Sequence, residues 1–481
     1  MQSEPARLAS LMKNQPIFAL VDCNNFFVSC ERLFRPGLEN KPVVVLSSND
    51  GCAVSRSNEA KELGIPMGAP AFKYRDVFER HSVTKFSANF ELYGNISRRI
   101  TALLTTITPS TEIYSIDESF MDLSQLPIID YEEWGREVRR LILDWIGIPV
   151  SIGIAPSKTL AKLANLQAKK NPDLGGVLSF IKPHENHAKD CERTDLSRVQ
   201  TADPLLSTGE IICERSVLSH IDHAKIQEYL ARTPVADVWG IGWRLAPKMR
   251  AEGVGNALNL SKLRPQRAQQ LMGIQGRQLV AELNGTSCYK LTLEGKLPQS
   301  VASTRTFGED TGDIHAIEAA MATFIVTATY KLRRSNQLTC RVTLFATTNR
   351  HKPGYQSWHR EIHLPQPTAD PGIIINAVMN SFKEFYQPQI MYHRAGVGLH
   401  NFVPDSHLQT DLLRTIDTTG HDRSKSRLAA VDALNNQYGK RTVRYASEIA
   451  ATTWRPKYQL RSPRYVSRWD ELPHITPKLF I

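Results

Sequence analysis

The chain has 481 residues, enough for about three domains, and its net charge of +11 at pH 7 favours a polyanionic partner. Its 7 cysteines show no C-x-x-C spacing, which argues against a zinc or disulfide framework and for a reducing cytoplasm. The N-terminus lacks the apolar core of a signal peptide, and no apolar run approaches the roughly 18 residues of a membrane span.

Six segments in the first part of the chain alternate between strand and helix patterns. They are residues 16–22 (strand), 91–107 (helix), 111–116 and 119–124 (a hairpin), 131–146 (helix) and 150–155 (strand). The order β-α-β-β-α-β is that of the ferredoxin-like fold, in which the first strand lies beside the third. An insertion over residues 30–90, with a strand at 41–47 and a helix at 57–63, is placed to reach over the site.

Three acidic residues lie where this topology brings distant segments together. Asp22 ends the first apolar run, and Asp117 and Glu118 occupy the predicted hairpin turn. Such carboxylates suit magnesium, which prefers oxygen ligands together with substrate phosphates. Two metal ions held this way activate an attacking oxygen and neutralise a leaving one. Any one of these acids alone is more often an ordinary strand-end or turn residue, but the three together favour polymerase chemistry.

The rest of the chain is less regular. Residues 181–215 are polar and poorly periodic, which predicts a long loop. A Gly-x-Gly turn at Gly240 and Gly242, followed by a basic helix with Lys248, resembles a helix-hairpin-helix, whose backbone amides bind a DNA phosphate. Residues 337–348 and 396–403 predict strands that flank helical stretches, and beyond Pro404 the chain becomes polar, then basic and aromatic.

Together these features resemble the Y-family translesion DNA polymerases, most closely their UmuC branch. The matching motifs include Asp22-Cys-Asn-Asn-Phe-Phe, Tyr114-Ser-Ile-Asp-Glu118, Lys158-Thr-Leu-Ala-Lys162, Asp237-Val-Trp-Gly-Ile-Gly242, Arg305-Thr-Phe-Gly-Glu309 and Leu460-Arg-Ser-Pro-Arg-Tyr465. The resemblance implies an α+β multidomain fold shaped as a right hand. Its parts would be a ferredoxin-like palm (16–30 and 91–180), fingers (31–90), a helical thumb (181–292), a little finger (293–403) and a C-terminal extension (404–481).

The resemblance also implies roles at the site. Asp22, Asp117 and Glu118, with the backbone carbonyl of Cys23, would hold two Mg2+ ions. Phe27 would be a steric gate that excludes a ribose 2′-hydroxyl, although a core phenylalanine is the alternative. For the neighbouring Phe26, core packing and sugar support are both open.

Cations at the site would bind the triphosphate of a deoxynucleotide. The resemblance assigns Lys61 and Lys158 to this role, with a solvated surface lysine as the alternative for each. Asn58 stands where many relatives have a phosphate-binding tyrosine, and Arg56 is a hypothetical replacement. Gly240, Gly242 and Lys248 would contact primer-template DNA.

Two further features concern partners. Gln409, Leu412 and Leu413 resemble a degenerate sliding-clamp-binding peptide, with a plain helix start as the alternative. The basic and aromatic C-terminal region predicts contact with nucleic acid or with protein. In UmuC-like proteins this region is associated with a UmuD′ dimer and RecA, so the resemblance implies a UmuD′-like dimer and RecA as partners.

The resemblance implies an error-prone polymerase that adds deoxynucleotides opposite damaged template bases in an SOS-type response. Three other classes compete with this interpretation. They are a catalytically inactive Y-family-like scaffold that recruits partners, a nucleotide cyclase with a similar palm, and a basic DNA-binding module. The scaffold is disfavoured because all three acids are present. The cyclase is disfavoured because the chain has a Gly-x-Gly hairpin suited to binding duplex DNA, and a cyclase binds no duplex.

Overall fold

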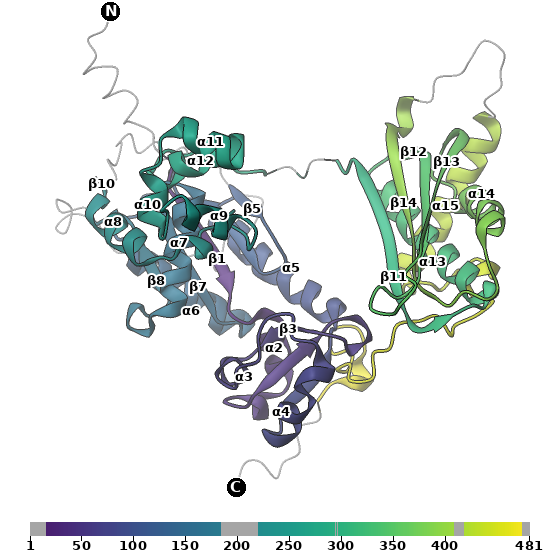
Figure 1. The fold of residues 1–481 in the computed structure, drawn as a ribbon, viewed down its shortest axis with the longest axis horizontal. Coiled ribbons are helices and arrows are strands. Elements are labelled where there is room, and N and C mark those ends of the chain that lie inside the picture. Colours follow the sequence, from purple (N-terminus) through teal and green to yellow (C-terminus); the bar gives the residue numbers. More distant parts are fainter. Residues whose placement is uncertain (1–15, 184–219, 294, 296, 408–417, 474–481) are drawn as a thin grey trace, which may run out of the picture.

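The computed structural model describes residues 16–183, 220–293, 295, 297–407 and 418–473. The described elements form two bodies, with a small insertion packed on the first (Figure 1). Two stretches of chain join the bodies: the segment after residue 283, and a C-terminal segment that returns from the second body to the insertion. None of the helices in these residue ranges is long and apolar enough to cross a membrane.

The first body is built on a five-stranded sheet with the order β5-β6-β1-β7-β8. Its strands are β1 (Phe18–Cys23), β5 (Thr111–Ile113), β6 (Glu118–Asp122), β7 (Val150–Ala155) and β8 (Val177–Ser179). Its helices are α5 (Phe90–Ile107), α6 (Tyr131–Ile146) and α7 (Lys158–Lys170). The predicted β-α-β-β-α-β order is confirmed, and β1 lies between β6 and β7.

Alternation along β1 explains why the sheet is covered on both faces. Ala19 and Val21 pack into the core with α5 and α6, whereas Phe18 and Leu20 pack into a second core with α7. Asp22 follows this second set, so its side chain lies on the α7 face. The strand therefore points its terminal carboxylate toward the helix that carries the motif beginning at Lys158.

The insertion contains a three-stranded sheet with the order β3-β2-β4. Its elements are α2 (Phe26–Phe34), β2 (Val43–Leu46), β3 (Ala53–Arg56), α3 (Asn58–Glu62), α4 (Arg75–Arg80), β4 (Thr84–Ser87) and three 3-10 turns (Pro36–Leu38, Ser48–Asp50 and Ala71–Tyr74). The predicted strand and helix of the insertion are confirmed as β2 and α3. The other elements are too short to show a periodic pattern.

Several short helices between residues 223 and 283 pack on α7, after a few short elements that follow this helix. The elements are a 3-10 turn (Pro172–Leu174), β9 (Ile181–Lys182), β10 (His220–Ile221), α8 (His223–Arg232), a 3-10 turn (Val235–Asp237), α9 (Leu245–Ala251), α10 (Ala257–Ser261), α11 (Pro265–Met272) and α12 (Ile274–Leu283). Most of the predicted loop at 181–215 lies outside the described residues. The first of the two short helices expected around Gly240 is a single 3-10 turn, so that expectation was wrong in part.

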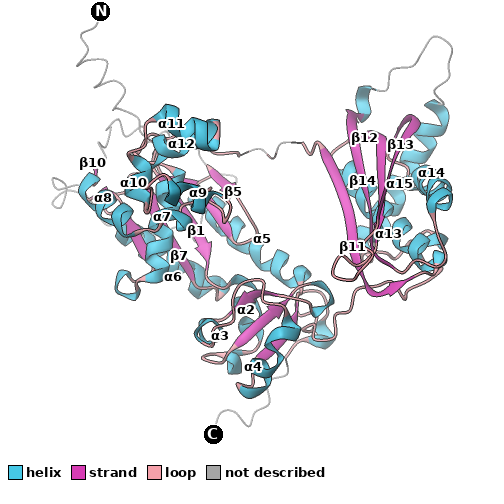
Figure 2. Cartoon of the chain, in the orientation of Figure 1, coloured by secondary structure: helices cyan, strands magenta, loops and turns pink. Residues whose placement is uncertain are grey.

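The second body is a four-stranded sheet with the order β11-β14-β12-β13. Its elements are β11 (Ser300–Thr311), α13 (Ile314–Arg334), β12 (Gln337–Thr347), β13 (Ser357–Thr368), α14 (Pro371–Phe385), β14 (Tyr392–Pro404), a 3-10 turn (Asp405–His407), α15 (Thr418–Gln437) and a 3-10 turn at Ala446–Glu448. A last 3-10 turn, Trp469–Glu471, follows the segment that returns to the insertion, and Leu472 beside it packs on the core of the first body. Helices α13 and α14 pack against one face of the sheet (Figure 2). The two predicted strands are confirmed, and β11 and β13 were not predicted.

Gly153 is required where β7 crosses α7. A Cβ on this residue would meet the Ala161 carbonyl oxygen at 2.2 Å and the Asn165 nitrogen at 2.3 Å. Backbone atoms cannot move aside as a side chain can. The substitution Gly153→Ala should therefore lower the free energy of unfolding by about 3 kcal/mol, measured by urea denaturation.

Gly94 provides the matched control because it lies within α5 and no atom lies within 4 Å of an added Cβ. Gly94→Ala should leave stability unchanged or raise it by about 0.5–1 kcal/mol. Equal denaturation midpoints for Gly153→Ala and the parent chain would contradict the close approach of β7 to α7.

Candidate active site

The pairing of two strands brings the three acids together. Strands β1 and β6 are antiparallel, and their register sets Asp22 directly opposite Glu118. One residue further along, the Cys23 N–H donates to the carbonyl oxygen of Asp117 at 2.9 Å. The acids therefore meet at one edge of the sheet, although they come from distant parts of the sequence.

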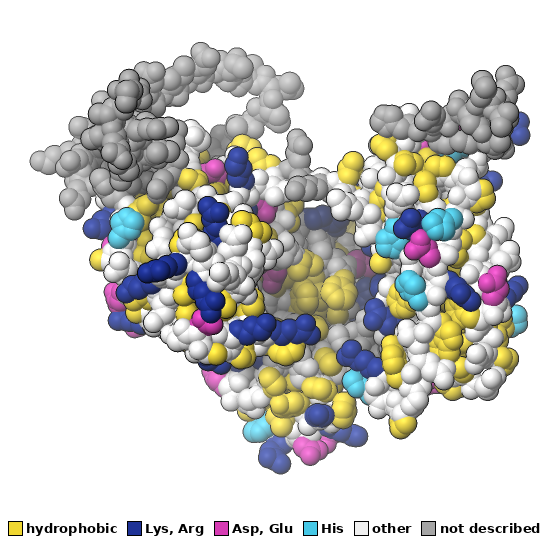
Figure 3. Space-filling view, turned by 45° about the horizontal axis from the view of Figure 1, so that its top comes forward, with side chains coloured by type: hydrophobic (Ala, Val, Ile, Leu, Met, Phe, Trp, Pro, Cys, Tyr) yellow, Lys and Arg dark blue, Asp and Glu magenta, His cyan; other side chains and the backbone are white. Residues whose placement is uncertain are grey.

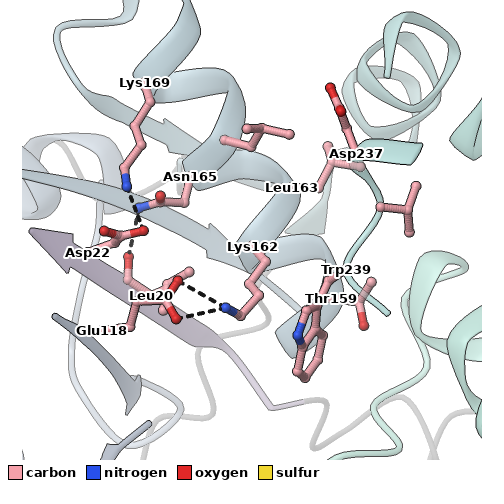
Figure 4. A pocket seen from close by; sticks show the side chains of 12 residues that line it. Leu20, Asp22, Glu118, Thr159, Lys162, Leu163, Asn165, Lys169, Asp237 and Trp239 are labelled. Carbon is pink, nitrogen blue, oxygen red and sulfur yellow. Dashed lines mark hydrogen bonds and ion pairs between the residues drawn. The ribbon is translucent and has the colours of Figure 1, made fainter. Parts of the chain in front are cut away.

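A pocket of about 240 Å³ opens beside these acids, between the sheet, α7 and the turn before Gly240 (Figure 4). Asp22 and Glu118 line it, together with Lys162, Lys169 and Trp239. Asp117 is not among the residues that line it, and it stands on the β5–β6 turn.

Two lysines of α7 neutralise the acids in this pocket. Lys169 Nζ lies 2.6 Å from Asp22 Oδ2, and Lys162 Nζ donates to both carboxylate oxygens of Glu118 at 2.9 Å. Lys162 also lies over the rings of Tyr114 and Trp239, at 4.5 and 5.3 Å from their centroids. This contact with two aromatic rings holds the ammonium group beside Glu118.

These two lysines were not assigned from the sequence. A signal was present, because Lys158, Lys162, Asn165 and Lys169 follow the spacing of one helix face in an otherwise apolar segment. The family resemblance pointed to Lys158, the first member of this stripe. The two members further along are the ones that reach the acids.

Lys158 has a different place. It is only 4% exposed, forms an ion pair with Glu112 on β5, and donates to the Lys290 carbonyl oxygen at 3.0 Å. Its charge is needed to offset the buried carboxylate of Glu112. The contact ties α7 to β5 and to the segment after α12, and Lys158 is not among the residues that line the pocket.

The acids carry an excess of negative charge. Burial raises the pKa of Asp22 to about 6; Lys169 opposes this shift, whereas Glu118 and Asp117 add to it. Ser115 Oγ donates to Asp117 Oδ1 at 2.6 Å and accepts from the Glu118 N–H at 3.0 Å, which orders the turn. Burial and the two neighbouring carboxylates thus oppose the ionised form of Asp22, and Lys169 favours it.

The donor set fits magnesium in its chemistry, since carboxylate oxygens are the ligands that this ion prefers. Within the residue ranges described, however, no three His, Cys, Asp or Glu side chains converge tightly enough to enclose an ion. Lys162 and Lys169 hold the carboxylates of Glu118 and Asp22 instead. Closure around a metal would require these lysines to turn away.

The two phenylalanines at the start of α2 differ in environment. Phe26 is 3% exposed and belongs to the core, so core packing is its role. Phe27 is half-buried and stacks on Tyr93, with ring centroids 4.5 Å apart and planes 12° apart. Phe90 meets the Phe27 ring edge-on at 5.8 Å. Phe27 is thus a partly exposed ring supported by its aromatic neighbours.

Cations from the insertion face the same space. Lys61 Nζ donates to Asn25 Oδ1 at 2.7 Å and to Asn58 Oδ1 at 3.1 Å. Burial lowers the pKa of Lys61, and the charges of Arg56 and Lys169 lower it further. The three cations are therefore close enough to repel one another, an arrangement that an anionic ligand would stabilise.

The remaining assigned residues lie away from the pocket or beyond the described chain. Gly240 has a φ of 90°, which favours glycine, and the Gly242 carbonyl accepts from the Leu245 and Ala246 N–H groups at the start of α9. Lys248 is exposed on α9. The expected clamp peptide at 409–413 lies outside the described residues.

Known families match most of this chain. The impB/mucB/samB family matches residues 21–166, and its C-terminal domain matches residues 298–412. A domain of unknown function, DUF4113, matches residues 428–475. ImpB of Salmonella typhimurium is 33% identical over 95% of this chain and 99% of its own length. UmuC of Salmonella typhimurium strain LT2 is 34% identical over the same shares of the two chains.

More distant relatives have the same fold. DNA polymerase IV 1 of Bacillus subtilis is 26% identical over 61% of each chain. A solved chimera of the Y-family DNA polymerases Dbh and Dpo4 is similar with a TM-score of 0.57 and 20% identity, over 81% of this chain and 99% of that chain. An insertion ternary complex of Dbh DNA polymerase has a TM-score of 0.50 over the same shares. The fold is that of an α+β multidomain polymerase.

The different places of Lys158 and Lys169 on α7 lead to a prediction about stability. Lys158→Ala should lower the free energy of unfolding by about 3–5 kcal/mol because it leaves Glu112 buried without a counter-charge. Lys169 is 31% exposed, and Lys169→Ala should cost about 1 kcal/mol or less. Chemical denaturation of both variants tests this.

The double variant Lys158→Ala with Glu112→Ala is the control, and it should recover part of the loss because no charge then remains buried alone. A Lys158→Ala variant as stable as the parent chain would mean that Lys158 is not a structural residue.

Proposed function

This chain belongs to the impB/mucB/samB family of Y-family DNA polymerases, and we propose that its three acids form the catalytic site. As a member it is a DNA-directed DNA polymerase of error-prone translesion synthesis in an SOS-type damage response. The observation that carries the assignment of the site is the cross-strand pair of Asp22 and Glu118, with Asp117 on the adjoining turn. An inactive scaffold is disfavoured because these acids are all present and adjacent.

The family uses divalent metal ions, and here Asp22, Asp117 and Glu118, with the backbone carbonyl of Cys23, would hold two Mg2+ ions. Bound magnesium lowers the pKa of a primer 3′-hydroxyl and neutralises the triphosphate of the incoming nucleotide. The position of Asp22 supports this assignment, because its carboxylate is largely buried directly across the strand pair from Glu118. Lys162 donates to both oxygens of Glu118 and would have to release them for this carboxylate to hold a metal ion.

Three cations would receive the triphosphate. Lys169, which pairs with Asp22 and is 31% exposed, would present its ammonium group to a phosphate. Lys61 and Arg56 approach from the insertion, where the lowered pKa of Lys61 reflects burial and the neighbouring charges. Positioned cations of this kind stabilise the charge that develops in phosphoryl transfer. Arg56 would take the place of the tyrosine that Asn58 replaces.

Phe27 would select the sugar. Tyr93 stacks on one face of this ring and so fixes the position of the ring. A ribose 2′-hydroxyl would collide with the other face, whereas deoxyribose would stack on it. The aromatic ring therefore rejects ribonucleotides by contact and not by charge.

Both described bodies would contact the DNA. We assign the five-stranded sheet as palm, the insertion as fingers, the helices α8–α12 as thumb and the four-stranded sheet as little finger. Figure 3 shows a recess between the two bodies with Lys and Arg side chains on the surface to either side. Primer-template DNA would occupy this recess, and the turn with Gly240 and Gly242, followed by Lys248, would bind a backbone phosphate.

Protein partners complete the proposal. A sliding clamp would dock on Gln409, Leu412 and Leu413. A UmuD′-like dimer and RecA would bind elsewhere on the chain, at surfaces that include the C-terminal extension. The site of action would be DNA in the cytoplasm.

Loss of one acid should separate chemistry from DNA binding. Asp117→Ala should reduce extension of a primer past an abasic site by about a thousandfold or more, because a metal ligand is lost. DNA affinity, measured by fluorescence anisotropy, should change less than about twofold, since the basic surfaces remain.

Asp122→Asn is the matched control, because Asp122 is the acid at the other end of β6 and bonds to Ser124 at 2.9 Å. It should retain extension. Full extension by Asp117→Ala would refute the metal assignment, and failure of the parent chain with all partners present would refute polymerase activity.

The gate assignment predicts a change in sugar selection. Phe27→Ala should raise the use of ribonucleotides relative to deoxyribonucleotides at least about tenfold, because the surface that rejects the 2′-hydroxyl is removed. Single-nucleotide incorporation kinetics give this ratio. Phe72→Ala, at a 77% exposed position of the same insertion, should leave it unchanged. An unchanged ratio in Phe27→Ala would place the gate elsewhere.

A further inference from the structure

A C-terminal segment joins the second body to the fingers. Residues 454–465, which we name the strap, leave the four-stranded sheet and end against α2 (Figure 1). The strap lies inside the region that matches a domain of unknown function. The basic and aromatic composition of this region predicted contact with nucleic acid or protein, but Trp454 and Tyr465 are 5% and 7% exposed and pack into the chain's own cores.

One end of the strap is anchored on the four-stranded sheet. Trp454 packs edge-on against Phe324 of α13, with centroids 5.4 Å apart. The Gly308 N–H donates to the Trp454 carbonyl at 3.3 Å, and Lys457 Nζ donates to Glu309 at 2.8 Å. A Cβ on Gly308 would meet the Arg455 carbonyl oxygen at 2.5 Å, so the two backbones are in close contact.

The other end is anchored on the fingers. The Ser87 N–H donates to the Leu460 carbonyl at 3.0 Å, and the Leu460 N–H donates to Ser87 Oγ at 2.9 Å, which adds the strap to the edge of β4. Tyr465 stacks on Phe34 of α2 with centroids 4.4 Å apart and planes 6° apart. The strap is thus paired to a strand edge and stacked on a helix.

Between these anchors the strap reaches the base of the gate. Ser462 Oγ donates to Glu31 Oε1 at 3.0 Å, and Tyr93 OH donates to the same oxygen at 2.7 Å. Tyr93 is the residue on which Phe27 stacks. Glu31 is fully buried, and within the described chain its other oxygen, Oε2, has no hydrogen-bond partner. A continuous path of contacts therefore runs from Ser462 through Glu31 and Tyr93 to Phe27.

We propose that Ser462 of the strap is a positioning residue for sugar selection, an inference that rests on the proposed gate function of Phe27. Glu31 is buried with few partners, so the loss of one donor leaves its carboxylate free to shift. Tyr93 follows because its hydroxyl is bonded to that carboxylate, and the ring under Phe27 then moves. A gate that rejects a hydroxyl by contact is sensitive to such a displacement.

The same path explains why a segment so far along the chain belongs to the nucleotide site. Asn89, at the N-terminus of α5, donates to Ser462 Oγ at 3.0 Å and accepts from Arg461 at 2.9 Å. Asn89 caps the helix that carries Tyr93. The strap therefore supports the gate both through Glu31 and through the start of α5.

The test compares ribonucleotide with deoxyribonucleotide incorporation in the full-length chain. Ser462→Ala should raise the ratio of kcat/KM values for ribonucleotide over deoxyribonucleotide by about threefold to tenfold. Ser462→Thr keeps the hydroxyl and should stay within about twofold of the parent. The ratio does not depend on the fraction of folded enzyme, so partial unfolding does not move it.

A second variant and a control accompany these measurements. Tyr93→Phe removes the other donor to Glu31 Oε1, and the double variant with Ser462→Ala should depart from the product of the single effects because both hydroxyls share one oxygen. Gln459→Ala changes an exposed strap side chain and preserves the backbone bond to Asp50, so it should leave the ratio unchanged.

The outcomes separate this proposal from the function on which it rests. An unchanged ratio in Ser462→Ala, with a raised ratio in Phe27→Ala, would overturn the role of the strap alone. An unchanged ratio in Phe27→Ala would overturn the gate and this proposal together. Equal effects of Gln459→Ala and Ser462→Ala would show that the strap acts only as general support, and would also overturn the proposal.

Discussion

The antiparallel pairing of β1 with β6 is the constraint on which the site depends. Because side chains alternate along a strand, a slip of one residue would turn Asp22 into the core with α5 and α6 and separate it from Glu118. The apolar residues of β1 resist such a slip, since each face of the strand is already buried. The hydrophobic core therefore sets the position of the carboxylates.

Helix α7 divides its cations between structure and chemistry. Lys158 offsets a buried carboxylate at the joint with β5, while Lys162 and Lys169 are held beside the acids of the pocket. The difference lies in exposure, because a lysine that is almost fully buried cannot exchange its partner without a large cost. The more exposed Lys169 can exchange its ion pair with Asp22 for another partner at a smaller cost. One stripe of similar side chains thus serves two purposes.

The ring of Phe27, our proposed gate, is supported by contacts that begin far along the chain. One face of Phe27 rests on Tyr93, whose hydroxyl is fixed by a buried carboxylate. The strap adds the second donor to that carboxylate and also joins the four-stranded sheet to the fingers. Under the gate role proposed for Phe27, sugar selection and the attachment of the second body would share residues of the C-terminal region.

Periodic patterns and turn residues are local signals, so they predicted the order of elements in the first body and the meeting of Asp22 with the turn that carries Asp117 and Glu118. Which lysine of α7 meets Asp22 depends on the folded chain, since four polar residues share one helix face and neighbouring elements select among them. Tertiary packing also decided that Trp454 and Tyr465 are buried. No local pattern predicts a contact between Ser462 and Glu31, because the two residues are far apart in the sequence and come together only in the folded chain.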